Sequence, residues 1–267
     1  MKQVLTRLAL IFLAATPARA GGTALEAMMT GDDSRGWEAV GRLNMAGKGF
    51  CTGALISEIL VLTAAHCLFD ADTGAPYAAA DIEFLAGWRG GRAAAYRGVR
   101  RAVAHPDYLE GGEDRSMDLA LVELDQPIRN ARVTPFATGA LAPRTRQVGV
   151  VSYAHDRADM PSIQNLCHVL GSAKDTLVLD CEVDFGSSGA PVFDLSGDWP
   201  QIVSVVSAKA MAGAVEVSLG TALEGPLADL RAILDAGDGV LNRLRPTVRV
   251  MGREDAASAT GAKFIRP

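Results

Sequence analysis

From Trp37 onward the chain is built of short alternating or apolar runs separated by glycines and other turn residues, and this pattern limits its fold more than any other feature. Such runs, bounded by turn signals, are typical of strands joined in hairpins. They occupy residues 39–43, 50–56, 59–63, 81–85, 97–103, 119–124, 147–151, 177–183 and 201–207. Helical spacing of leucines appears at 226–236, before the stop signal Gly237. We therefore predict an all-β fold in two halves, followed by a short C-terminal helix.

The first 20 residues have the order of a secretory signal peptide. Lys2 and Arg7 precede an apolar run over 8–15, and small residues follow at Ala18 and Ala20. The alternative, a membrane anchor, requires roughly 20 apolar residues and is not met by this run. We expect cleavage after Ala20, a secreted or periplasmic protein, and no stable membrane insertion once the signal is removed.

Two stretches outside the strand pattern have no periodicity. Residues 21–36 are polar and irregular, so we expect a mobile leader or a propeptide there. Residues 241–267 read as an extended tail of unknown role. The main domain is expected over 37–240, with its halves at about 37–135 and 136–225 and the helix after them.

The cysteine count is even, in a chain whose expected export permits disulfides. Although the sequence alone allows more than one pairing, the four cysteines form two local pairs. We favour the bridges Cys51–Cys67 and Cys167–Cys181. Neither pair has the close C-x-x-C spacing of a structural zinc site, so we predict no metal and no cofactor.

The charge pattern bears on the partners. The formal net charge is −5, and no cluster of Lys and Arg is interleaved with aromatic residues. Because nucleic-acid-binding domains present a basic footprint of that kind, we expect no nucleic-acid partner. Proteins or peptides are the expected partners, and nothing in the sequence defines an oligomeric state.

One glycine-rich stretch, Asp184-Phe-Gly-Ser-Ser-Gly-Ala-Pro191, contains a serine suited to nucleophilic chemistry. A backbone that turns sharply, presents a hydroxyl and aims two N–H groups at one point needs residues without a Cβ atom. Gly186 and Gly189 meet that need on either side of Ser188. The alternative is an ordinary turn rich in Gly, Ser and Pro.

Two further residues have acid–base chemistry in a suitable setting. His66 follows small residues at the end of an apolar run, in Thr63-Ala-Ala-His-Cys67. Asp118 opens an otherwise apolar run, and burying its carboxylate is costly without a donor such as an imidazole N–H. The alternatives are a structural histidine and a turn aspartate. The remaining histidines lie in neither setting and are expected to be structural or exposed: His105, His155 and His168.

In their order along the chain, these three stretches resemble the catalytic motifs of the chymotrypsin/trypsin family of serine peptidases. The run at 50–56 is similar to the family's cysteine-containing strand, and His105-Pro-Asp-Tyr108 is similar to a common non-catalytic segment. The resemblance covers about 37–236. It implies two six-stranded antiparallel β-barrels with a catalytic cleft between them.

The resemblance also assigns roles by position. It implies that Ser188 attacks the scissile carbonyl, that His66 takes and returns the proton, and that Asp118 orients the imidazole. The N–H groups of Gly186 and Ser188 would form an oxyanion hole. The protein would then be a secreted serine endopeptidase. The alternatives are a catalytically silent homologue acting as a binding or scaffold module of the cell envelope, and an envelope protein with accidental motifs.

Substrate-binding residues are less well defined. By position, the resemblance places Ser207 on a strand that lines the site and pairs with the substrate backbone. Glu182 and Asp184 are the candidates for recognising a basic substrate side chain. Lys209 would instead neutralise a carboxylate or favour an acidic substrate side chain.

Ser187 departs from the family pattern. Animal members usually have an aspartate just before the nucleophile, and this aspartate pairs with a new N-terminal amine after zymogen cleavage. A hydroxyl cannot form that ion pair, and bacterial secreted members often share the departure. We therefore expect an enzyme that is competent soon after its signal peptide is removed.

Overall fold

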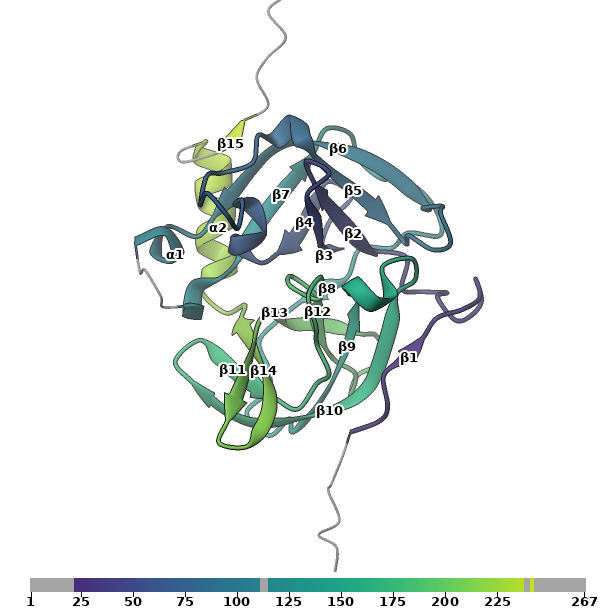
Figure 1. Ribbon diagram of the computed structural model, residues 1–267, viewed down its shortest axis with the longest axis vertical. Helices are drawn as coiled ribbons and strands as arrows, with labels where there is room; N and C mark the ends of the chain where they lie inside the picture. The colour runs from purple at the N-terminus through teal and green to yellow at the C-terminus, as the bar shows by residue number, and fades with distance from the viewer. Residues whose placement is uncertain (1–21, 111–114, 238–240, 243–267) are drawn as a thin grey trace, which may run out of the picture.

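The computed structural model describes residues 22–110, 115–237 and 241–242, so the predicted signal peptide and nearly all of the predicted tail lie outside the described residues. The chain forms two closed six-stranded antiparallel β-barrels, one above the other in Figure 1. This architecture confirms the fold predicted from the sequence.

The first barrel is formed by the N-terminal half of the chain. Its strands are β2 (Val40–Met45), β3 (Gly49–Leu55), β4 (Leu60–Thr63), β5 (Ile82–Ala86), β6 (Ala95–Ala104) and β7 (Ala120–Leu124). They follow the order β6-β5-β2-β3-β4-β7, and pairing of β6 with β7 closes the barrel. A two-residue strand, β15 (Leu241–Asn242), adds to β6 from outside.

The second barrel repeats this design. Its strands are β9 (Gln147–Ser152), β10 (Ser162–Ala173), β11 (Thr176–Leu179), β12 (Pro191–Asp194), β13 (Gln201–Ala212) and β14 (Val215–Ala222). They follow the order β10-β11-β14-β13-β12-β9, and pairing of β9 with β10 closes the barrel. The short strand β8 (Ala137–Thr138) lies parallel to β13.

Helices are short and lie outside the barrels. They are η1 (Ala65–Leu68), η2 (Ala79–Asp81), α1 (Pro106–Glu110), η3 (Arg115–Met117), η4 (His155–Arg157) and α2 (Pro226–Ala236). Helix α2 begins with a proline, which suits a first helical turn, and is capped after Ala236 by the left-handed Gly237. The helix lies against the first barrel, although it follows the second in the chain (Figure 1). Its leucines Leu227, Leu230 and Leu234 are buried in the core.

An aromatic cluster lies in the core where the two barrels meet. The ring of Trp37 lies 5.8 Å from that of Phe136 and 5.1 Å from that of Phe193. Phe136 and Phe193 are themselves 4.8 Å apart. Trp37 precedes the first barrel and Phe193 lies in the second, so the cluster fastens one barrel to the other.

The structure corrects the predicted strands of the second barrel. The predicted run 177–183 is too long, because β11 ends at Leu179 and Cys181 is bridged back to Cys167 in β10. Strand β10 itself was not predicted, because polar residues and a glycine interrupt its apolar pattern. Strands β12 and β14 were missed as well.

The stretch at 21–36, expected to be irregular, contains a short strand. Strand β1 (Glu26–Ala27) pairs with Ile163 and Ser162 of β10, and the N–H of Thr23 donates to the carbonyl of Leu166. Met28 is buried, with 2% of its surface exposed. This stretch therefore lies against the second barrel rather than apart from it. Whether it is removed as a propeptide stays a prediction.

Candidate active site

His66 and Asp118 both come from the first barrel and meet next to β4. The chain leaves β4 at Thr63, passes through the buried Ala64 and Ala65, and turns into η1, which carries His66. A disulfide between Cys51 and Cys67 ties η1 to strand β3. The small alanines allow the tight turn, and the disulfide holds the residue next to His66 in place.

The contact between His66 and Asp118 is bidentate. Nδ1 of His66 lies 2.7 Å from Oδ2 of Asp118, and the backbone N–H of His66 donates to Oδ1 at 2.9 Å. A carboxylate only accepts hydrogen bonds, so Nδ1 carries the hydrogen in this pair. The other ring nitrogen, Nε2, is then the basic one. About a quarter of the His66 side chain, 27%, is exposed to solvent.

Asp118 is fully buried, yet its surroundings favour the ionised carboxylate. Burial opposes ionisation of its carboxylate, but hydrogen bonds from the His66 side chain, the hydroxyl of Ser207 and the His66 N–H outweigh it, and the pKa of Asp118 lies below its usual value of 3.8. The aspartate is therefore ionised at neutral pH and can stabilise a positively charged His66.

Ser188 lies in the loop before β12, in the second barrel. Both flanking glycines have left-handed backbone angles, with φ of 96° at Gly186 and 78° at Gly189. A Cβ atom on Gly189 would lie 2.2 Å from the carbonyl oxygen of Thr52, and one on Gly186 would strike the ring of Phe50. The loop thus takes a shape that only glycine permits at these two positions.

Thr52 holds this loop against the first barrel, a role that the sequence analysis missed. Its N–H donates to the carbonyl of Ser188 at 2.8 Å, and its hydroxyl donates to the carbonyl of Gly186 at 2.8 Å. The same hydroxyl accepts from the N–H of Tyr153 at 3.0 Å. The local sequence gave Thr52 no distinguishing signal, because a threonine in a buried strand is ordinary.

The backbone around Ser188 offers two unpaired N–H groups. Within the described ranges, no hydrogen bond involves the N–H of Gly186 or that of Ser188. The carbonyl of Phe185 accepts from the N–H of His155 at 2.7 Å. Because the N–H and C=O of a trans peptide point in opposite directions, the N–H of Gly186 points away from His155. Two donors are thus available to an incoming oxygen.

Neighbouring residues bring the Ser188 loop to the histidine. The Cα of Gly189 lies so close to the end of β4 that an added Cβ would be 3.1 Å from the N atom of Ala64, two residues before His66. No direct hydrogen bond between the Ser188 hydroxyl and the His66 ring occurs among the described residues. Hydrogen bonds of this kind are often long before substrate binds.

The four residues expected to bind substrate differ in their contacts and exposure. The side chain of Ser207 binds Asp118 instead of facing outward. Nζ of Lys209 lies 2.7 Å from Oε1 of Glu216, and this hydrogen bond, with Asp184 adding a smaller effect, raises the pKa of Lys209. Glu182 and Asp184 are both exposed. Their roles in binding substrate stay predictions.

The other histidines occupy different places. His105 is buried, with Nε2 3.8 Å from Oδ2 of Asp229, and His155 stacks on Phe50. His168 makes side-chain and backbone contacts with Asp180.

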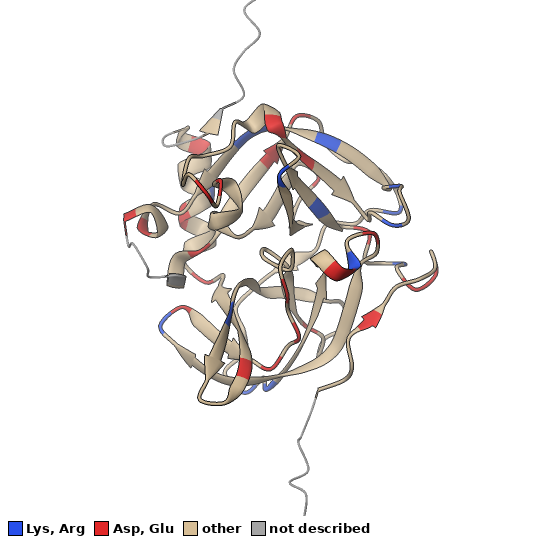
Figure 2. Cartoon of the chain, viewed as in Figure 1, with Lys and Arg blue, Asp and Glu red and all other residues tan. Residues whose placement is uncertain are grey.

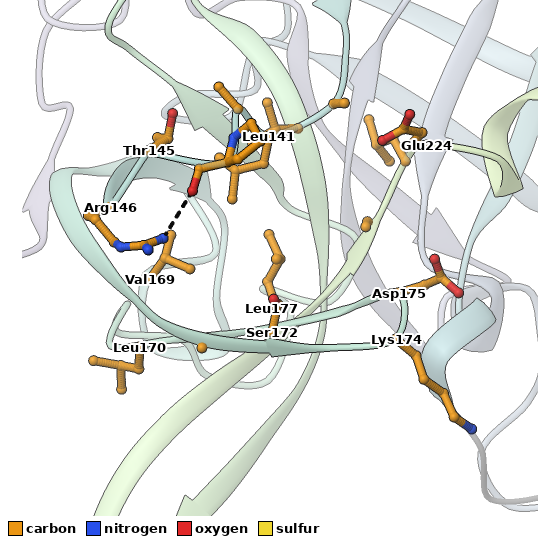
Figure 3. A pocket seen from close by; sticks show the side chains of 17 residues that line it. Leu141, Thr145, Arg146, Val169, Leu170, Ser172, Lys174, Asp175, Leu177 and Glu224 are labelled. Atoms are coloured by element: carbon orange, nitrogen blue, oxygen red, sulfur yellow. Dashed lines mark hydrogen bonds between the residues drawn. The ribbon is translucent and has the colours of Figure 1, made fainter.

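A pocket of about 660 Å³ opens on the second barrel, and none of the residues considered above as catalytic or substrate-binding lines it (Figure 3). Arg146 crosses one side of it and donates to the carbonyl of Pro143.

His66 and two cysteines form a cluster of potential metal ligands. Ligand atoms of Cys51, His66 and Cys67 lie within 4.8 Å of one another. Both sulfurs, however, belong to one disulfide, so neither is available as the thiolate that binds metals. These residues do not make a suitable metal site while the disulfide is intact.

Basic and acidic residues are interspersed over both barrels (Figure 2). Within the described residues, the helices are all too short or too polar to cross a bilayer.

Comparison with known proteins places the fold and the sequence in a family. A sequence profile described as Trypsin matches residues 30–217. Among solved structures, the chain is similar to a Glu endopeptidase determined in complex with MPD, with a TM-score of 0.67 and 17% sequence identity. The alignment covers 79% of this chain and 97% of that one, and at this identity it shows the fold alone. The sequence match spans both barrels and the loop that carries Ser188, and on that ground the chain belongs to the trypsin family.

Proposed function

We propose that the protein is a secreted serine endopeptidase that uses Ser188, His66 and Asp118 to hydrolyse peptide bonds through an acyl-enzyme. The observation that supports this most is the buried carboxylate of Asp118, which binds Nδ1 of His66 and makes Nε2 the basic nitrogen. Family membership supports proteins or peptides as substrates.

In the first half of the reaction, Oγ of Ser188 forms a bond to the carbonyl carbon of the substrate while its proton passes to Nε2 of His66. The carbonyl oxygen becomes an oxyanion and accepts hydrogen bonds from the N–H groups of Gly186 and Ser188, each of which contributes roughly 3–4 kcal/mol. The C–N bond then breaks as His66 gives the proton to the leaving amine.

In the second half, water takes the place of the amine. His66 removes a proton from the water, whose oxygen bonds to the acyl carbon, and the proton then returns to Oγ of Ser188 as the ester bond breaks. Asp118 remains a carboxylate throughout and stabilises the positively charged imidazolium that forms twice in each cycle.

Charge beside the nucleophile supports a proposal for substrate preference. Because the cation of Lys209 is paired with Glu216, the exposed carboxylates of Glu182 and Asp184 are the less compensated charges. We expect cleavage after basic residues. The similar solved protein is named a Glu endopeptidase, so a peptide library with basic, acidic and small residues before the scissile bond is the measurement that decides.

The proposed location follows from the N-terminal sequence and the cysteines. Residues 1–20 have the order of a signal peptide, and both disulfides of the structure belong to an oxidising compartment. N-terminal sequencing of protein recovered from the medium or periplasm tests this, with Gly21 as the expected first residue.

A fluorophosphonate probe tests the catalytic assignment. The folded protein should be labelled at Ser188, and Ser188→Ala should abolish labelling. His66→Ala should slow it strongly, because the base is lost. Ser196→Ala is the matched control, since Ser196 is an exposed serine in the next loop, and it should be labelled like the wild type.

The same experiment separates the alternatives. A folded protein that the probe does not label would be a silent homologue that serves as a binding or scaffold module. Labelling that survives Ser188→Ala would place the nucleophile elsewhere.

A further inference from the structure

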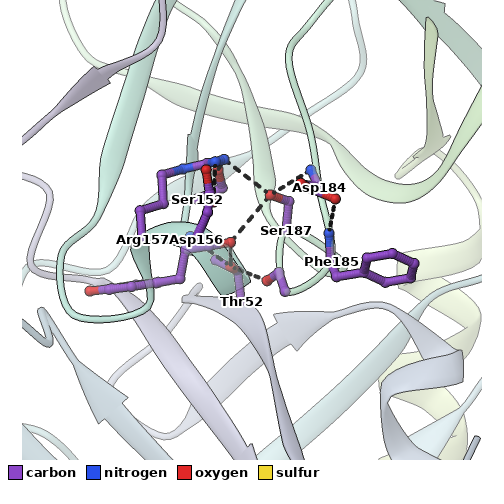
Figure 4. Close-up of polar contacts among 9 residues, drawn as sticks. Thr52, Ser152, Asp156, Arg157, Asp184, Phe185 and Ser187 are labelled. Atoms are coloured by element: carbon purple, nitrogen blue, oxygen red, sulfur yellow. Dashed lines mark hydrogen bonds and ion pairs between the residues drawn. The ribbon is translucent and has the colours of Figure 1, made fainter. Parts of the chain in front are cut away.

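A partly buried arginine lies behind the nucleophile loop. Arg157 ends the short helix η4, between strands β9 and β10, and only 15% of its side chain is exposed. Its guanidinium points toward Ser187, the residue just before the nucleophile (Figure 4). Burying a guanidinium is costly unless nearby groups accept its hydrogen bonds, so its partners are informative.

Those partners are mostly uncharged hydroxyls. The Nη2 atom of Arg157 lies 3.4 Å from Oγ of Ser187 and 3.4 Å from Oγ of Ser152. Nη1 lies 2.9 Å from a carboxylate oxygen of Asp156, which is 66% exposed. In the part of the chain that the structure describes, nothing accepts a hydrogen bond from Nε. The inner side of the guanidinium therefore faces two serine hydroxyls, while its charged partner, Asp156, lies on the exposed side.

Ser187 connects this cation to the catalytic loop. Its side chain is fully buried, its hydroxyl donates to the carbonyl of Tyr153 at 3.2 Å, and it accepts from the N–H of Asp184 at 3.3 Å. Ser187 stands between Gly186 and Ser188, the two residues whose N–H groups are unpaired. Figure 4 shows these contacts of Ser187, and they restrain the backbone between the two donors.

The N-terminal stretch of the chain is occupied elsewhere. The N–H of Thr23 donates to Leu166, the N–H of Met28 donates to Pro161, and β1 pairs with β10. An amine created near Gly22 would thus be held along β10, and reaching Ser187 would require this strand to come away.

We propose that Arg157 is a positioning residue that orders the nucleophile loop through Ser187 from within the chain, in place of an N-terminal amine released by cleavage. The proposal rests on the proposed peptidase function. Arg157 does not touch the substrate. It acts by keeping the N–H groups of Gly186 and Ser188 aimed at the developing oxyanion, so the enzyme requires no cleavage for activation beyond removal of the signal peptide.

The test compares Arg157→Met with the wild type by probe labelling and by peptide hydrolysis. Because a misplaced oxyanion hole affects the transition state, the labelling rate and kcat should fall between about tenfold and a hundredfold, while KM changes by less than about twofold. Asp156→Asn is the matched control. It removes the exposed partner of Arg157, leaves the buried contacts intact and should retain the wild-type rate.

Ser187→Ala keeps the proposal testable if Arg157→Met does not fold. It is a smaller change that removes the hydroxyl linking Arg157 to the loop, and it should lower kcat in the same way. If both single variants fold, kcat of the double variant should be no lower than kcat of the slower single variant. Each substitution breaks the same contact between Arg157 and Ser187, so the second adds no further loss.

Three results would overturn the proposal. They are a folded Arg157→Met with a labelling rate within about twofold of the wild type, additive effects of the two substitutions, and activity that arises only after cleavage within 22–36. Absence of labelling in the folded wild type would instead refute the peptidase function, and the role of Arg157 with it, so the two failures are distinguishable.

Discussion

The hydroxyl of Ser207 donates a hydrogen bond to Oδ2 of Asp118, the same carboxylate oxygen that lies 2.7 Å from Nδ1 of His66. Ser207 belongs to strand β13 of the second barrel, whereas Asp118 lies two residues before β7 of the first. Because Asp118 is fully buried, each donor offsets part of the cost of removing its charge from water. The packing of the two barrels is thereby linked to the ionisation of Asp118.

Ser207→Ala should lower kcat about tenfold, because a hydrogen bond to a charged group contributes about 1.5–3 kcal/mol and its loss raises the pKa of Asp118. Ser204→Ala is the control on the same strand, since the buried Ser204 hydroxyl donates to the carbonyl of Thr221 instead. It should lower the free energy of unfolding and leave kcat of the folded enzyme unchanged. Equal kcat in Ser207→Ala and the wild type would show that Asp118 does not need this donor.

Gly189→Ala should destabilise the protein by about 4 kcal/mol or more, because left-handed strain and overpacking add together. An added Cβ would lie 2.1 Å from Oγ1 of Thr63 and 2.2 Å from the carbonyl oxygen of Thr52. Gly213→Ala has a similar φ of 65° but no atom within 4 Å, so it should cost only about 1–2 kcal/mol. Urea unfolding of both variants measures the difference. Similar losses would mean that strain alone, and not the close approach of the two barrels, requires Gly189.

Met28→Ala should lower the free energy of unfolding by about 2–5 kcal/mol, as expected for a buried side chain truncated in a core. Its neighbour Met29 is 61% exposed, and Met29→Ala should stay within about 0.5 kcal/mol of the wild type. Thermal or urea unfolding checks both. If Met28→Ala is as stable as Met29→Ala, burial of the Met28 side chain does not hold the stretch at 22–36 against the second barrel.

Asp70 should make stability depend on pH. A hydrogen bond from Lys48, followed by one from the N–H of Thr73, lowers the pKa of Asp70 to about 2. Since the folded value lies below the ordinary 3.8, the stabilisation is complete above the ordinary value and is lost as the pH falls toward 2. Asp70→Asn should therefore be less stable than the wild type at pH 7.

The difference between Asp70→Asn and the wild type should shrink as the pH falls through that window and vanish below it. Urea unfolding at a series of pH values measures it. Asp72→Asn changes an exposed carboxylate in the same loop and should behave like the wild type throughout. A constant difference between Asp70→Asn and the wild type at every pH would show that shape, and not charge, accounts for the contribution of Asp70.

Much of the fold could be predicted from local patterns. The strands of the first barrel and the helix α2 follow from short apolar runs, turn residues and helical spacing, features that lie within a few residues of each other. Strand β10 could not be found in this way. Its polar Gln164 is buried because its amide side chain binds Thr23 and Glu182, and partners so distant in the sequence leave no local pattern.

The sequence by itself determined the strand-rich class, the helix and the settings of His66, Asp118 and Ser188, because periodicity and turn chemistry depend on adjacent residues. Only the tertiary structure decided which polar groups meet in the interior. Asp118 finds His66 across 52 positions and Ser207 across 89, and Arg157 reaches Ser187 across 30. The free-energy cost of burying a charge or a hydroxyl is offset by hydrogen bonds to partners that only folding brings close.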